Sequence, residues 1–173
     1  MRNYLNVVQS PKSKAQCQKP VLDFEHRTLD FGLWTLDFGL LYSATFTDHL
    51  ANPRNVGELP DASAVAEESN PVCGDRLRLS LRVRDGRIEA ARFLAYGCAP
   101  TLACGSVLAE MIEGMTIEDA ARLTRQEITR VLGGLPARKQ HAAALSIETL
   151  RAALEARARA THSAPEGRDI SSP

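Results

Sequence analysis

The feature that most constrains this chain is an alternating segment near its middle, residues 73–98, which reads CGDRLRLSLRVRDGRIEAARFLAYGC. Leucine or valine occupies every second position from Leu77 to Val83, with arginine or serine between them. A period of two puts the apolar side chains on one face and predicts a half-buried strand. Asp85-Gly86 then supplies the positive φ angles of a type I′ hairpin turn.

The strands on either side of this one are less regular. The return strand is predicted over 87–96, and its apolar positions change phase between the Ile88/Ala90 pair and the Phe93/Ala95 pair, which indicates a bulge. A weak pattern at 64–67 predicts an edge strand. The three strands together predict a small antiparallel sheet.

Helical signals surround the hairpin on both sides. A short helix begins near Tyr42 and is stopped by Pro53, because proline disfavours helical geometry in the residue before it. Pro100 can begin the next helix, because the N–H that proline lacks would have no hydrogen-bond partner within the first turn of a helix. Thr116 caps another, with Asp119 three residues on. Two more are expected at 126–132 and 139–156, so the fold class is α+β, with helices packed on one face of the sheet.

Composition narrows the class of protein. The chain of 173 residues suits one domain with a tail at each end, and 21 basic residues balance 21 acidic ones. No global charge favours nucleic acid, and no apolar run reaches the length of a membrane span. The four cysteines are too few and too unevenly spaced for a disulfide scaffold. The expectation is a soluble cytoplasmic protein with reduced thiols that binds neither nucleic acid nor membrane. The arginine-rich face of the hairpin is interpreted as a solvated sheet face.

The two ends are set aside from the domain, which is predicted over 42–156. Residues 21–41 contain three seven-residue units, and Thr28 to Trp34 matches the translation of a tandem DNA heptamer, ACTTTGG. Residues 1–41 are therefore either translated upstream repeat DNA or a disordered leader, and we expect them to be dispensable. Cys17 and His26 lie in this segment and are therefore not counted among the candidate ligands. Residues 157–173 are predicted to be a disordered tail.

Candidate ligands stand at the ends of predicted elements. Cys73 and Asp75 share the parity of Leu77, so both should point toward the core side at the end of the strand. A carboxylate buried there without a partner would be costly, which favours a metal ion or another cation. The alternative is that Asp75 ends the strand at the solvent boundary and Cys73 is a small buried apolar residue.

Cys98 and His141 complete the set. Cys98 precedes the helix opened by Pro100, and a helix N-terminus favours the thiolate that ligates metal or accepts sulfur. His141 stands at the start of the last helix, while His49, on the first helix, is expected to face solvent. Two thiols, a carboxylate and an imidazole suit zinc or an iron–sulfur cluster. Cys104 falls on the apolar stripe of its helix and is interpreted as core packing.

Three segments of the chain resemble the NifU/IscU-type iron–sulfur cluster assembly scaffolds, over residues 42–156. They are YSATFTDHLANPRNVGEL, the CGD…YGC hairpin and LPARKQHAAALSIETLRAAL. The resemblance implies the SufE/IscU-like fold and a non-enzymatic scaffold. Such a scaffold receives sulfur from a cysteine desulfurase, binds iron, assembles a transient [2Fe–2S] cluster and passes it to acceptor apoproteins. It also implies that Cys73, Asp75, Cys98 and His141 are cluster or metal ligands.

The chain departs from the family pattern at two places. A cysteine usually follows the histidine directly, but Ala142 stands here, which puts full scaffold activity in question. LPARK, at 135–139, only partly matches the segment recognised by an Hsp70-type chaperone, so that partner is left open, as is a homo-oligomer. Two alternatives also remain open: a zinc-binding sulfur acceptor that stimulates a desulfurase, and a structural zinc domain.

Overall fold

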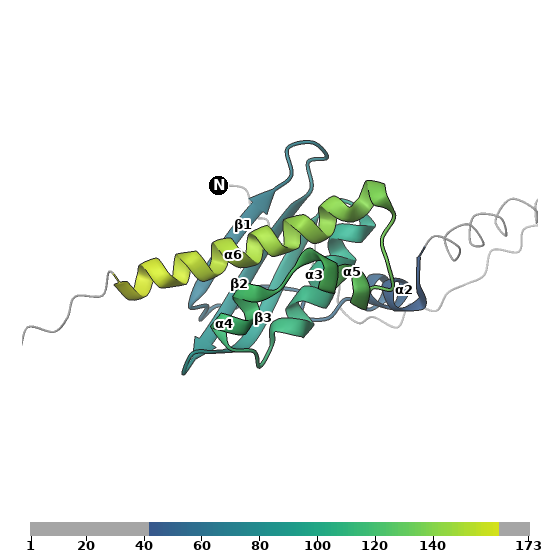
Figure 1. Cartoon of the computed structure of the whole chain (residues 1–173). Coiled ribbons are helices and arrows are strands. Elements are labelled where there is room, and N and C mark those ends of the chain that lie inside the picture. Colours follow the sequence, from purple (N-terminus) through teal and green to yellow (C-terminus); the bar gives the residue numbers. More distant parts are fainter. Residues whose placement is uncertain (1–41, 163–173) are drawn as a thin grey trace, which may run out of the picture.

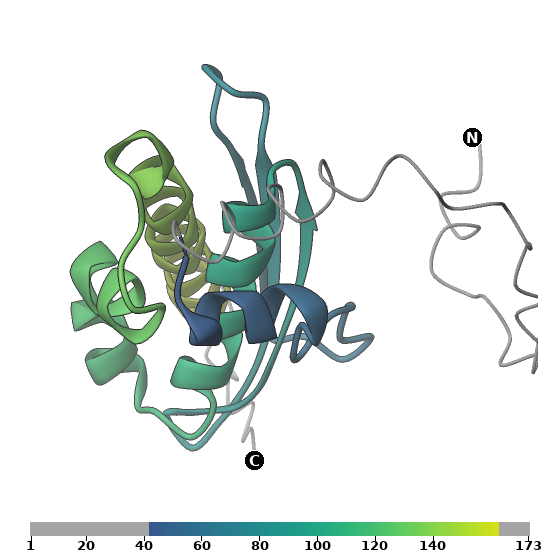
Figure 2. The ribbon, with the colours of Figure 1, turned by 90° about the vertical axis from the view of Figure 1, so that its right-hand side faces the viewer.

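The structure, a computed structural model, describes residues 42–162. Three strands form one antiparallel sheet in the order β1 (Ala64–Ser69), β2 (Arg76–Arg84) and β3 (Arg87–Tyr96). Helices α3 (Ala99–Ile112), α4 (Ile117–Arg122), α5 (Arg125–Val131) and α6 (Gln140–His162) follow, with the short 3-10 turn η2 (Ala137–Lys139) before α6. They lie on one face of the sheet (Figure 2), so the predicted α+β class is confirmed.

The sheet follows the alternating sequence pattern. The leucines of β2 are fully buried, and its arginines lie on the other face, where they form ion pairs with Glu58, Asp61, Glu67 and Glu89. Asp85 and Gly86 both have positive φ, as the predicted turn requires. The bulge is present at Glu89, because Val83 pairs with Ile88 and Arg82 with Ala90. It lies nearer the turn than the change of phase indicated.

The core lies between the sheet and two crossing helices (Figure 1). Helix α6 packs on β1 and β2, and α3 packs on β3. Apolar side chains from both layers, including Leu79, Phe93, Leu108 and Leu150, are buried between them. Pro100 lies in the first turn of α3 and Thr116 caps α4 through the N–H of Asp119, as predicted. Among residues 42–162, no helix combines the length and the apolar character needed to cross a membrane.

The ends of the domain differ in part from the expectation. Helix α2 (Ala44–Ala51) stops before Pro53, as predicted, and packs against α3. Helix α6 continues to His162, so the disordered tail expected from Arg157 is helical over 157–162. Alanine and arginine, the main residues of that segment, are good helix formers, and the prediction of a disordered tail did not account for this. The leader, residues 1–41, and residues 163–173 lie outside the described part.

Candidate functional site

Four predicted ligands meet at one end of the sheet. Cys73 comes from the turn between β1 and β2, Asp75 from the residue before β2, Cys98 from the N-cap of α3, and His141 from the first turn of α6. One ligand atom each from Cys73, Asp75 and His141 lies within 4.8 Å of the others. The Cys98 Sγ lies 3.1 Å from Asp75 Oδ2. With Thr101, which also contacts Asp75, we call these residues the Asp75 cluster.

Asp75 is the buried centre of this cluster. It is 4% exposed, and both of its oxygens accept hydrogen bonds. The backbone N–H of Cys98 donates to Oδ1 at 3.1 Å, while the Thr101 hydroxyl donates to Oδ2 at 2.7 Å. Burial alone would raise the pKa of Asp75, but the hydrogen bonds from Thr101 and Cys98 outweigh it and lower the pKa from 3.8 to about 2. The carboxylate is therefore ionised at neutral pH and able to bind a cation.

His141 presents one ring nitrogen to the carboxylate. Its Nδ1 lies 3.0 Å from the backbone oxygen of Arg138. Because a carbonyl oxygen can only accept, the proton sits on Nδ1 and the lone pair on Nε2. That Nε2 is buried, 3.5 Å from Asp75 Oδ2, and has no hydrogen-bond partner within residues 42–162. A backbone carbonyl that fixes the tautomer in this way is typical of metal-binding histidines.

Cys73 differs from its predicted position. We expected it on the core side of a strand, but the strand begins only at Arg76 and Cys73 is exposed in the preceding turn. Gly74, with φ of +73°, breaks the extended backbone there, so the parity of β2 no longer applies before Asp75. The sulfur is therefore accessible from outside and still near Asp75 and His141.

Gly97 allows the carboxylate to approach the start of α3. A Cβ on this residue would lie 2.2 Å from Asp75 Oδ1, and its φ of +148° is also unfavourable for other residues. Neither Gly97 nor Thr101 was identified as part of the site from the sequence. A hydroxyl three residues after Cys98, in the first turn of the helix, was the available signal for Thr101.

Cys104 and Ala142 lie in the core. Cys104 is fully buried, which confirms its predicted packing role, and burial together with the neighbouring Cys98 raises its pKa to about 12. A thiol held protonated to that pH is a poor metal ligand. Ala142 is also fully buried, immediately after the half-buried His141.

His49, expected to face solvent, is 5% exposed, so that prediction was wrong. Its Nδ1 lies 2.9 Å from the Ser106 hydroxyl on α3, and its Nε2 lies 3.8 Å from a carboxylate oxygen of Glu110. The backbone N–H of Arg54 also donates to Ser106 Oγ, at 2.8 Å. We call these four residues the His49 cluster. It ties α2 and the following loop to α3, and this packing of two helices is what the local sequence did not reveal.

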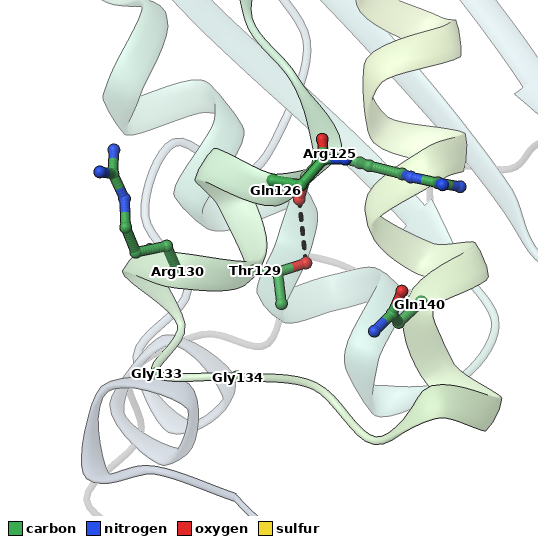
Figure 3. Close-up of a pocket in the computed structure, with 7 residues that line it drawn as sticks. All are labelled: Arg125, Gln126, Thr129, Arg130, Gly133, Gly134 and Gln140. Carbon is green, nitrogen blue, oxygen red and sulfur yellow. Dashed lines mark hydrogen bonds between the residues drawn. The ribbon is translucent and has the colours of Figure 1, made fainter.

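A separate hollow of about 410 Å³ lies between α5 and the start of α6 (Figure 3). Its lining offers no thiol, carboxylate or imidazole. It consists of Arg125, Gln126, Thr129, Arg130, Gly133, Gly134 and Gln140. Among the described residues, the group of histidine, cysteine and carboxylate side chains close enough to hold a metal ion is Cys73, Asp75 and His141.

Similarity to known proteins agrees with this geometry. The chain is 44% identical over 114 residues to iron–sulfur cluster assembly scaffold protein IscU 1 of Archaeoglobus fulgidus, covering 66% of this chain and 74% of that protein. It is 43% identical over 119 residues to nitrogen fixation protein NifU of Cereibacter sphaeroides, covering 69% of this chain and 48% of that protein.

The fold is also found in solved structures. The N-terminal part of a nitrogen-fixing NifU-like protein from Brucella abortus superposes with a TM-score of 0.53 and 22% identity, over 72% of this chain and 96% of the other. The model of the NifU-like N terminal domain family matches residues 41–163. The chain therefore belongs to the family of NifU-like N-terminal domains.

Proposed function

We propose that this chain is a scaffold on which an iron–sulfur cluster is assembled and from which it is passed to other proteins. The observation that carries this function is the convergence of Cys73, Asp75 and His141 within 4.8 Å, with the Cys98 thiol against the same carboxylate. Thiolates are the usual ligands of iron–sulfur clusters, and histidine can replace them. Relatives named as scaffolds for cluster assembly support this function, and they do not support the zinc alternatives.

The exposed position of Cys73 suits both the delivery of sulfur to the site and the release of the finished cluster. A buried cluster site would exclude the donor of sulfur and the acceptor of the finished cluster, whereas Cys73 is open to solvent and Cys98 partly so. We propose that a cysteine desulfurase supplies the sulfur, that the cluster is of the [2Fe–2S] type, and that acceptor apoproteins receive it. The three free thiols in the described part suit a reducing compartment such as the cytoplasm.

Anaerobic reconstitution tests this function. The full chain is incubated with ferrous iron, L-cysteine, a cysteine desulfurase and dithiothreitol, and cluster formation is followed by visible absorption and Mössbauer spectroscopy. We expect a [2Fe–2S] spectrum from the wild type and none from Cys98→Ser. Cys104→Ala is the matched control, because it removes a thiol that is fully buried in the core. A wild-type chain that takes up no cluster, or a Cys98→Ser variant that takes up as much, would contradict the proposal.

Asp75 should make the cluster transferable. Carboxylate oxygen is a poorer match than thiolate for iron–sulfur chemistry, so this ligand is the one expected to leave first. Asp75→Ala should therefore slow transfer to an apo-ferredoxin acceptor once a cluster has formed. Equal or faster transfer from the variant would show that Asp75 is not the labile ligand.

A further inference from the structure

Thr101 is a fully buried hydroxyl that the family comparison does not assign to the site. It lies in the first turn of α3, three residues after Cys98, and donates to Asp75 Oδ2 at 2.7 Å. It is shorter than the hydrogen bonds to that carboxylate from the N–H and the Sγ of Cys98, which are both 3.1 Å.

Two fully buried hydroxyls of α6 donate differently. Ser146 and Thr149, both fully buried on α6, donate to the backbone oxygens of Ala142 and Leu145, four residues earlier in their own helix. Such back-bonding is the ordinary solution for serine and threonine inside a helix. Thr101 instead donates across to another element, so its hydrogen bond is specific to Asp75.

The donors to Asp75 do not all persist when a metal ion or cluster is bound. A Cys98 that ligates metal does so as the thiolate and has no proton to donate to Oδ2. The hydroxyl of Thr101 then remains as the donor to Oδ2, while the Cys98 backbone N–H still holds Oδ1. With one of these donors on each oxygen, the carboxylate plane stays fixed, and Oδ2 keeps a free lone pair at 3.5 Å from His141 Nε2.

We propose that Thr101 is a positioning residue that orients Asp75 as a ligand of the metal or cluster. The proposal deepens the scaffold function and rests on it for the identity of the cargo, but the orientation of Asp75 can be measured with a simple metal ion. Hydrogen bonds to metal-ligating carboxylates commonly contribute a factor of about 10 to 100 in metal affinity.

The test uses Zn²⁺ and Co²⁺ as probes of the full chain. Zinc affinity is measured by competition with a chromophoric chelator, and the Co²⁺ absorption spectrum reports the ligand geometry. Thr101→Val, which keeps the shape and removes the hydroxyl, should weaken zinc binding about 10-fold or more and change the Co²⁺ spectrum. Thr101→Ser, which restores the hydroxyl, should stay within about threefold of the wild type.

Thr149→Val is the matched control, because it removes another fully buried threonine hydroxyl far along α6. It should lower the melting temperature without changing zinc affinity per folded molecule. Thr101→Ala removes the hydroxyl without the bulk of valine and serves if Thr101→Val does not fold. Zinc affinity within twofold of the wild type in Thr101→Val or Thr101→Ala would overturn the proposal. So would a loss of zinc affinity in Thr149→Val equal to that in Thr101→Val.

A double-substitution cycle separates positioning from general packing. In an Asp75→Ala background, Thr101→Val should cause no further loss of zinc affinity, because the residue acts through Asp75. An additional loss equal to that in the wild-type background would show a purely structural effect and overturn the proposal. Failure of the scaffold function would be distinct: the wild type would then take up no cluster, while Thr101→Val would still weaken zinc binding.

Discussion

The Asp75 cluster and the His49 cluster lie against the same helix and use the same chemical groups. Each has a histidine, a carboxylate and a hydroxyl contributed by α3, from Thr101 in one and Ser106 in the other. In the His49 cluster the Ser106 oxygen accepts from the Arg54 N–H and lies 2.9 Å from His49 Nδ1, while His49 Nε2 faces Glu110, whose side chain is 56% exposed. One ring nitrogen of His49 therefore has a hydrogen-bond partner, and the other faces a solvated carboxylate.

The Asp75 cluster is incomplete by comparison. His141 Nε2 is buried and lacks a hydrogen-bond partner in the described part, and Cys73 beside it is exposed. A buried polar atom left unsatisfied costs free energy unless a ligand completes it. The comparison teaches that residue types alone do not separate a packing network from a binding site. What separates them is the kind of atom left unsatisfied: His141 Nε2 is an imidazole nitrogen that a metal ion could complete, whereas the buried nitrogen of the His49 cluster without a partner among residues 42–162, Arg54 Nη1, belongs to a guanidinium that only donates.

The largest effect on stability should come from His49. His49→Ala leaves a cavity and removes the partner of the buried Ser106 hydroxyl, so we expect the free energy of unfolding to fall by about 3 kcal/mol. Urea denaturation measures this loss, and zinc titration of the folded fraction should give the wild-type affinity. A variant with normal stability but weakened zinc binding would show that the two clusters have been assigned the wrong way round.

The next effect concerns Asp75 and depends on pH. The folded pKa of about 2 lies below the ordinary 3.8, so the ionised carboxylate stabilises the metal-free fold above about pH 4, and this contribution is lost as the pH falls toward 2. Asp75→Asn should be less stable than the wild type by about 2 kcal/mol at pH 7, since one pKa unit corresponds to about 1.4 kcal/mol.

The difference between Asp75→Asn and the wild type should shrink as the pH is lowered from 4 to 2, when the wild-type carboxyl becomes neutral. Denaturant unfolding at a series of pH values checks this. A difference that stays constant with pH would mean that the carboxylate is not held by the hydrogen bonds of Thr101 and Cys98.

A smaller effect is expected at Cys104. Cys104→Ser buries a hydroxyl among apolar side chains, so the free energy of unfolding should fall by about 1–2 kcal/mol. Cluster yield per folded molecule should be unchanged, because the thiol lies in the core. A protein with a normal melting temperature and no cluster would instead make Cys104 the replacement for the cysteine absent at Ala142.

The smallest effect is expected at Glu110. Its side chain is 56% exposed, and its contact with His49 is long, at 3.8 Å. Glu110→Gln should therefore change the free energy of unfolding by less than about 0.5 kcal/mol. Thermal unfolding is sensitive enough to set that limit. A larger loss would make the carboxylate an essential member of the His49 cluster.

Local pattern predicted much of this molecule. The hairpin, its turn, the capping of α4 by Thr116 and the start of α3 at Pro100 depend on neighbouring residues, so they could be inferred from the sequence. The four candidate ligands were likewise found from their places at the ends of elements. The contact of Thr101 with Asp75 and the burial of His49 could not be inferred, because each depends on contact between elements more than 20 residues apart. The exposure of Cys73 was missed because Gly74 interrupts the strand parity.

The Asp75 cluster draws its members from a turn, a helix cap and a second helix that are distant in sequence. An unfolded chain cannot bring these groups together, so any cargo they hold binds the native state alone. Mass action then links occupancy to folding: a ligand at 100 times its dissociation constant adds about 2.7 kcal/mol to the free energy of unfolding. Each delivery to an acceptor removes that increment, so the loaded and empty forms should differ in protease resistance.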